Sequence, residues 1–114
     1  MALKVVEETD TLTHIALTGQ LTVMGVERVT GALHEHVIGR GVNTIIDMTN
    51  VSFIASSGIN LLLDCRKQLL RSGAKIVLLG LRPDVEHTLR TARMDKLFDM
   101  VPTLEEAKGA LACL

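Results

Sequence analysis

Hydrophobic and polar positions follow two different periods along the chain, and these periods separate strands from helices. Five short segments are rich in apolar or β-branched residues, as β-strands are. These segments are residues 3–8, 12–18, 43–48, 75–79 and 97–101. The polar run Thr9-Asp10-Thr11 between the first two predicts a tight hairpin, so the sheet is expected to open antiparallel.

Between the later strands, apolar residues recur every three or four positions, which is the period of a helix with one buried face. The predicted faces are Val26, Val29, Leu33 and Val37, then Ile59, Leu62, Leu63 and Leu69, then Val85, Leu89 and Ala92. Pro83 suits a first helical turn, and Thr103 with Glu106 has the spacing of a capping box at the start of a last helix.

The order of these elements, β-β-α-β-α-β-α-β-α, predicts an α/β fold. We expect a mostly parallel, mixed sheet that opens with an antiparallel hairpin and continues through right-handed crossover helices. At 114 residues the chain has room for a single domain over residues 1–114. Its expected core includes Ile45, Ile46, Leu62, Val77, Leu78 and Leu89.

Composition narrows the range of partners. The net charge is −1, the two signs are interspersed along the chain, and Phe53 and Phe98 are its only aromatic residues. These features argue against nucleic acid as a direct partner. No segment has the length and apolarity of a signal peptide or membrane span, so we expect a cytoplasmic protein with no membrane insertion. Cys65 and Cys113 are far apart and are expected to be reduced, structural thiols.

No motif for catalysis, cofactor binding or metal binding is recognisable. The glycines form neither a Walker nor a dinucleotide-binding pattern, and Ser56-Ser57-Gly58 lacks the frame of a nucleophile elbow. His34 and His36 would point about 200° apart on a helix and could not readily chelate one ion. His14 and His87 have no neighbouring metal ligands in the sequence. We therefore expect no enzyme activity, no cofactor and no metal.

Ser56-Ser57-Gly58 is the most distinctive local feature, because it places two hydroxyls between a buried strand and the start of an amphipathic helix. Helix starts favour anions. Alternatively, one serine could simply cap the helix, which is the commonest use of serine at such a position.

The residues around this motif resemble the signature of the anti-sigma factor antagonists, which are stand-alone STAS domains. Residues 46–62, IDMTNVSFIASSGINLL, match the family pattern of a strand, Asp-Leu, Val-x-Phe and Asp-Ser-Ser-Gly-Leu. Residues 17–21 resemble the family's Leu-x-Gly-Glu-Leu turn, and residues 73–78 its Gly-Gly-x-Leu strand. Residues 89–98 and 103–107 resemble its late helix, Leu-Phe segment and Glu-Ala helix, so the likeness covers the whole chain.

This resemblance implies a bacterial partner-switching protein of transcription regulation. The unphosphorylated protein would bind an anti-sigma factor that is also a serine kinase, and so release the sigma factor. Phosphorylation would end the binding, and a serine phosphatase would be a further partner. Ser56 would be the phosphoacceptor, Ser57 and Gly58 would shape the helix entry, and Asp47 would fix the end of the central strand. The expected partner surface comprises Ser56, Ser57, Gly58, Asn60, Gly19, Gln20 and Thr22.

One departure from the family pattern leaves a second function open. Ala55 stands where the family has an Asp directly before the phosphoacceptor. The same surface could instead serve a constitutive scaffold or an accessory subunit of a larger assembly, such as the STAS partner of a lipid-transport ATPase. A small-molecule enzyme or nucleotide binder has only the general pocket-forming capacity of an α/β sheet in its favour.

Overall fold

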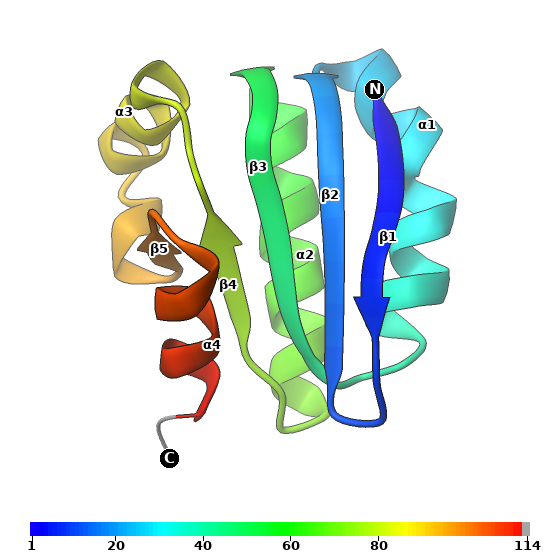
Figure 1. Ribbon diagram of the computed structural model, residues 1–114. Helices are drawn as coiled ribbons and strands as arrows, with labels where there is room; N and C mark the ends of the chain where they lie inside the picture. Colours follow the sequence, from blue (N-terminus) through cyan, green and yellow to red (C-terminus); the bar gives the residue numbers. More distant parts are fainter. Residues whose placement is uncertain (113–114) are drawn as a thin grey trace.

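A five-stranded mixed sheet forms the centre of the computed structural model, which describes residues 1–112 (Figure 1). The strands are β1 (Ala2–Glu8), β2 (Leu12–Leu21), β3 (Asn43–Ile54), β4 (Ile76–Leu79) and β5 (Asp99–Val101). The helices are α1 (Val23–Leu33), α2 (Ser56–Arg71), α3 (Pro83–Thr91) and α4 (Leu104–Ala112). A π-helical turn, η1 (His34–Ile38), extends α1, and a 3₁₀ turn, η2 (Met94–Lys96), precedes β5.

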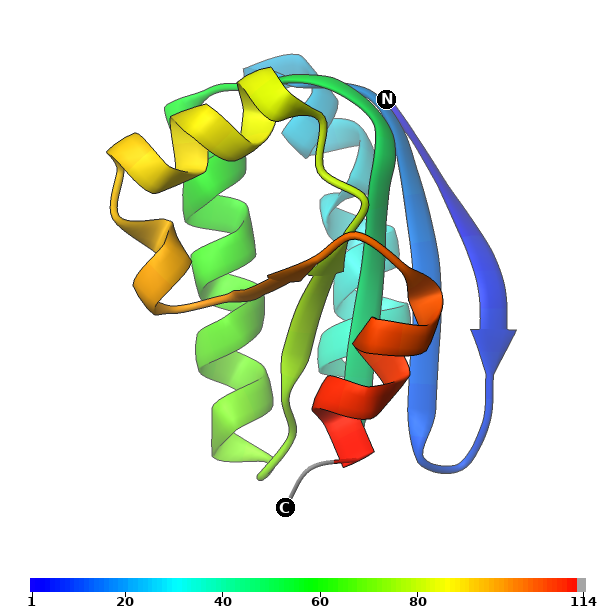
Figure 2. The same ribbon diagram turned by 60° about the vertical axis from the view of Figure 1, so that its left-hand side comes forward.

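The strands lie in the order β1-β2-β3-β4-β5, with β1 antiparallel to β2 and every other pair parallel. The N–H of Thr9 donates to the carbonyl of Leu12 at 2.8 Å and closes the predicted hairpin. Helices α1 and α2 cover one face of the sheet, whereas α4 lies on the other (Figures 1 and 2). The predicted fold class is therefore confirmed.

Two strands run further than the sequence pattern predicts. Strand β2 continues past residue 18 to Leu21, and β3 continues past residue 48 to Ile54. The register between β2 and β3 shifts between Ala16 and Thr18 and again between Gly19 and Gln20. Such irregularities interrupt the two-residue alternation by which a strand is recognised. As a result, both strands project beyond the end of the shorter β4.

Helix starts also differ in detail from the expectation. Helix α1 begins at Val23, earlier than its apolar face suggests, because Thr22 caps it by accepting a hydrogen bond from the Gly25 N–H at 3.2 Å. At the last helix, the Thr103 hydroxyl accepts from the Glu106 N–H at 3.2 Å as predicted. That same hydroxyl, however, donates to the Glu106 carboxylate at 3.4 Å. The capping box is thus formed without the expected bond back to the Thr103 N–H.

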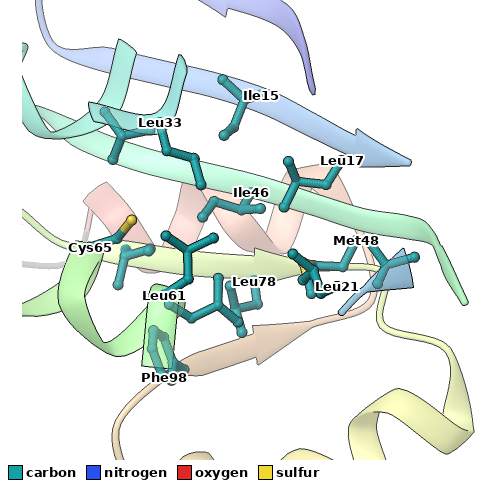
Figure 3. Close-up of a cluster of buried hydrophobic side chains, with 14 of the residues drawn as sticks. Ile15, Leu17, Leu21, Leu33, Ile46, Met48, Leu61, Cys65, Leu78 and Phe98 are labelled. Atoms are coloured by element: carbon teal, nitrogen blue, oxygen red, sulfur yellow. The ribbon is translucent and has the colours of Figure 1, made fainter. Parts of the chain in front are cut away.

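The main core lies between the sheet and the helices on its α1–α2 side (Figure 3). All six predicted core residues are buried. The prediction that Ala92 belongs to a buried helix face is wrong, because α3 ends at Thr91 and Ala92 is exposed just after it. Ile46 belongs to the main core, whereas its neighbour Ile45 packs on the opposite face against Ala107 and Leu111 of α4. Cys65 is a buried free thiol within the main core, and Cys113 lies outside the described residues.

Candidate functional site

Ser56 is the first residue of α2 and its side chain is exposed. The residue in the N-cap position is Ala55, which is extended and offers no side-chain hydrogen bond to the helix. The alternative that a serine of this motif caps α2 is therefore wrong. The first turn of α2 also carries no acidic residue, so a negative charge added there would meet the favourable end of the helix dipole.

The next two residues face inward. Ser57 is half-buried, and its Oγ is fully enclosed without a hydrogen-bond partner among the described residues. Gly58 is buried where α2 crosses the ends of β2 and β3. A Cβ at Gly58 would lie 2.8 Å from the Leu21 Cβ and 2.9 Å from the Ile54 Cγ1. Gly58 therefore permits close packing at the helix entry.

Backbone contacts hold the start of α2 beside the turn that follows β2. The Ala55 N–H donates to the Leu21 carbonyl at 2.9 Å, and Leu21 pairs with Ile54 in the sheet. The predicted surface residues Gly19, Gln20 and Thr22 flank Leu21 and line a hollow of about 290 Å³. Gln20 is exposed, as is Asn60 one turn into α2. The structure thus brings the two predicted halves of the surface together.

Three large apolar side chains at this edge were not predicted from the sequence. Val23 and Met24 open α1 with 62% and 66% of their surface exposed, and Phe53 near the end of β3 is 49% exposed. Exposed apolar groups that gather at one edge are typical of protein interaction surfaces. A signal was present in Thr22, because a cap there would place the next two residues in an exposed first turn.

The expectation that Asp47 fixes the end of the central strand is wrong. Asp47 lies within β3 and accepts hydrogen bonds from the backbone N–H of Thr49 at 2.9 Å and from the Thr49 hydroxyl. Its partner across the sheet is Leu79, the last residue of β4. Asp47 therefore marks the point where β4 ends and β3 continues, paired with β2, towards Ser56.

The comparison with known families identifies the fold. The profile described as "STAS domain" matches residues 4–107. The chain belongs to the STAS domain family.

Solved STAS structures resemble this chain over nearly its whole length. An anti-sigma-factor antagonist (STAS) domain protein from Planctomyces limnophilus has a TM-score of 0.84 at 23% identity, covering 96% of this chain and 97% of its own. Phosphorylated SpoIIAA of Bacillus, described as a cell fate determinant, has a TM-score of 0.72 at 24% identity, covering 96% and 98%. At such identities the likeness shows the fold alone.

A STAS fold also occurs within a much longer protein. The murine anion transporter Slc26a9 matches this chain with a TM-score of 0.75 at 18% identity, covering 95% of this chain but 19% of the transporter. Within residues 1–112 of the present STAS domain, no helix is long and apolar enough to cross a membrane.

The histidines of this STAS domain do not form a metal site in the described part of the chain. His34 and His36 fall in the π-helical turn η1, and the Nδ1 of His36 lies 2.7 Å from the Glu8 carboxylate. No group of three His, Cys, Asp or Glu side chains within residues 1–112 is arranged to hold an ion. His87 is exposed on α3.

Two buried titratable groups lie away from the Ser56 edge. Burial raises the pKa of the Cys65 thiol to about 12, so the thiol stays protonated and unreactive in the folded STAS domain. Burial lowers the pKa of His14, against the opposing effects of Asp47 and Glu7. The His14 Nε2 is enclosed without a hydrogen-bond partner in the described structure, which also favours the neutral ring.

Proposed function

We propose that this STAS domain is an anti-sigma factor antagonist whose binding is switched off by phosphorylation of Ser56. Its partner would be an anti-sigma factor that is also a serine kinase, and a serine phosphatase would reverse the modification. The protein would act in the bacterial cytoplasm by binding and not by catalysis. The observation that supports this proposal best is the exposed Ser56 on an uncapped helix start, beside an exposed apolar edge.

The surroundings of Ser56 suit a group that changes charge. A phosphate brings roughly −1.5 to −2 charges at neutral pH. Because Ser56 begins α2, the helix dipole would favour this charge by about 0.3–1 kcal/mol, so the phosphorylated domain should remain folded.

The same charge would oppose binding. Val23, Met24 and Phe53 provide the apolar centre of the proposed interface, and Gln20 and Asn60 provide polar positions near it. A phosphate carried into such an interface loses water without gaining a prepared cationic partner. The expected loss of affinity is more than tenfold, or more than about 1.4 kcal/mol.

The test compares wild type with Ser56→Ala and Ser56→Glu for binding to the cognate anti-sigma kinase, and maps phosphate by mass spectrometry after incubation with ATP. We expect phosphate on Ser56, none in Ser56→Ala, and more than tenfold weaker binding of Ser56→Glu. Thr11→Glu is the matched control, since it adds the same charge in the exposed hairpin at the opposite end of β2. Tight binding by Ser56→Glu together with an unmodified Ser56 would contradict the switch.

The alternative to this switch is that the domain serves as a constitutive scaffold or accessory subunit and uses the same edge for binding. Ala55 favours it, because this residue supplies no carboxylate beside Ser56. The occurrence of the fold within an anion transporter shows that STAS domains also serve as parts of larger proteins. The variant Ala55→Asp separates the two functions: it should change the rate of phosphorylation if a kinase acts on Ser56, and should leave partner binding unchanged if the domain is a constitutive subunit.

A further inference from the structure

The charged residues of the chain are divided unevenly between two regions. Residues 64–96 contain eight of the twelve Lys and Arg residues but four of the thirteen Asp and Glu residues. The remainder of the chain contains four cationic and nine acidic residues. The expectation that cationic and acidic residues are interspersed along the whole chain is therefore wrong. The net charge of −1 conceals their uneven division between the two regions. The cationic region comprises the second half of α2, the strand β4, α3 and η2.

An apolar groove lies at the border of this cationic region, between the last turns of α2 and the segment joining η2 to β5. Its volume is about 190 Å³, and it is lined by Arg66, Leu70, Ala74, Lys75, Ile76, Leu97 and Asp99. Leu70 is 52% exposed and Leu97 is 39% exposed. The Nε–H of Arg66 donates to the Leu97 carbonyl at 2.7 Å and holds the two walls together. The groove is therefore built by contacts between distant parts of the chain.

Several cationic residues line this groove or adjoin its lining residues along the chain. Arg66 and Lys75 line the groove itself. Lys67 and Arg71 are exposed and lie four residues apart on α2, and each directly follows a residue of the groove lining in the sequence. Lys96 is exposed on η2, immediately before Leu97. Asp99 is the one acidic residue of the lining, so the cations outnumber it. The charge around the groove is therefore positive and its floor is apolar.

The groove is remote from Ser56. Helix α2 has 16 residues, so at 1.5 Å per residue its ends are about 24 Å apart. Ser56 begins that helix, and Leu70 lies one residue before its end. A ligand in the groove could thus bind while the Ser56 edge is occupied or phosphorylated.

We propose that this groove binds a second protein partner through an acidic segment that also carries apolar side chains. Leucine-like side chains would cover Leu70 and Leu97, and the carboxylates of the segment would pair with Lys67, Arg71 and Lys96. Single-stranded nucleic acid fits less well, because Phe98 is buried and the groove offers no aromatic side chain for stacking. An anionic membrane fits less well because the apolar side chains line a hollow instead of protruding. This proposal does not depend on phosphorylation of Ser56.

The test is an NMR titration of ¹⁵N-labelled protein with the capped peptide Glu-Leu-Glu-Leu-Glu-Leu-Glu. We expect saturable shift changes centred on Leu70, Ala74 and Leu97, and none at Ser56. The peptide Lys-Leu-Lys-Leu-Lys-Leu-Lys should bind at least tenfold more weakly. Equal binding of the two peptides, shift changes confined to other surfaces, or no saturable change would overturn the proposal.

Variants locate the binding independently. The double variant Lys67→Glu/Arg71→Glu should weaken binding of the acidic peptide at least tenfold, and Leu70→Ser should weaken it severalfold. All three side chains are exposed, and the dispersion of the same spectra reports whether each variant is folded. Lys4→Glu, on the far edge strand β1, is the control for charge reversal and should bind as wild type does. Stronger binding to phosphatidylglycerol vesicles or to a DNA oligonucleotide than to the peptide, lost in the double variant, would overturn the choice of a protein partner.

Discussion

The helix entry at Gly58 gives the sharpest test of the packing that positions Ser56. An alanine Cβ at residue 58 would lie 2.8 Å from the Leu21 Cβ, 2.9 Å from the Ile54 Cγ1 and 2.9 Å from the Leu21 carbonyl oxygen. That oxygen already accepts from the Ala55 N–H at 2.9 Å. Relief of the clash must therefore move the end of β2 away from α2 or distort the hydrogen bond between them.

Two opposing effects set the expected free energy. Overpacking of this kind costs about 1–3 kcal/mol, whereas replacing glycine by alanine within a helix gains up to about 1 kcal/mol. We therefore expect Gly58→Ala to lower the free energy of unfolding by about 1–2 kcal/mol. Gly31→Ala is the matched control, since nothing lies within 4 Å of the added methyl group on α1. This control should gain about 0.5–1 kcal/mol.

Urea denaturation followed by circular dichroism measures both variants. With a slope of about 1–3 kcal/mol per molar urea, a difference of about 2 kcal/mol separates their midpoints by roughly 1 M. The slopes themselves should not change. If Gly58→Ala proved as stable as Gly31→Ala, the close approach of α2 to β2 would be refuted, and with it the inferred setting of Ser56.

Three further predictions concern single side chains. Cys65 should not react with a thiol reagent at pH 8 in the native protein but should react in urea, because burial raises the pKa of its thiol to about 12; rapid native reaction would contradict this. His14 should make the protein less stable in acid, because burial holds the pKa of its folded-state imidazole below the unfolded value near 6.5. The stability that the neutral buried ring allows is complete above the unfolded pKa and is lost as the pH falls towards the folded pKa. Urea midpoints at pH 7 and pH 5 should therefore differ more for wild type than for His14→Asn. Arg93, just after α3, has a φ of 62°, a conformation that glycine adopts without strain. Arg93→Gly should therefore raise the free energy of unfolding by about 0.5–1 kcal/mol. A lower free energy of unfolding in the same urea assay would show instead that the arginine side chain stabilises the fold.

The sequence by itself determined the order and type of the secondary structure and most of the core. Apolar periodicity, the Thr9-Asp10-Thr11 turn and Pro83 are local signals, and local signals suffice to choose between strand and helix. Ile45 and Ile46 are both buried as predicted, and they lie on opposite faces of the sheet because a strand directs successive side chains to opposite sides. The position of Ser56 at the start of α2 was likewise predicted from the pattern.

Only the tertiary structure decided how that position is built and what surrounds it. Irregular register between β2 and β3 extends both strands beyond β4, and no periodic pattern encodes such a shift. Gly58 is buried because Leu21 and Ile54 close over it, and the groove at Leu70 exists because Arg66 holds the segment around Leu97. The exposure of a side chain depends on which distant residues pack against it, and that information arises only when the chain has folded.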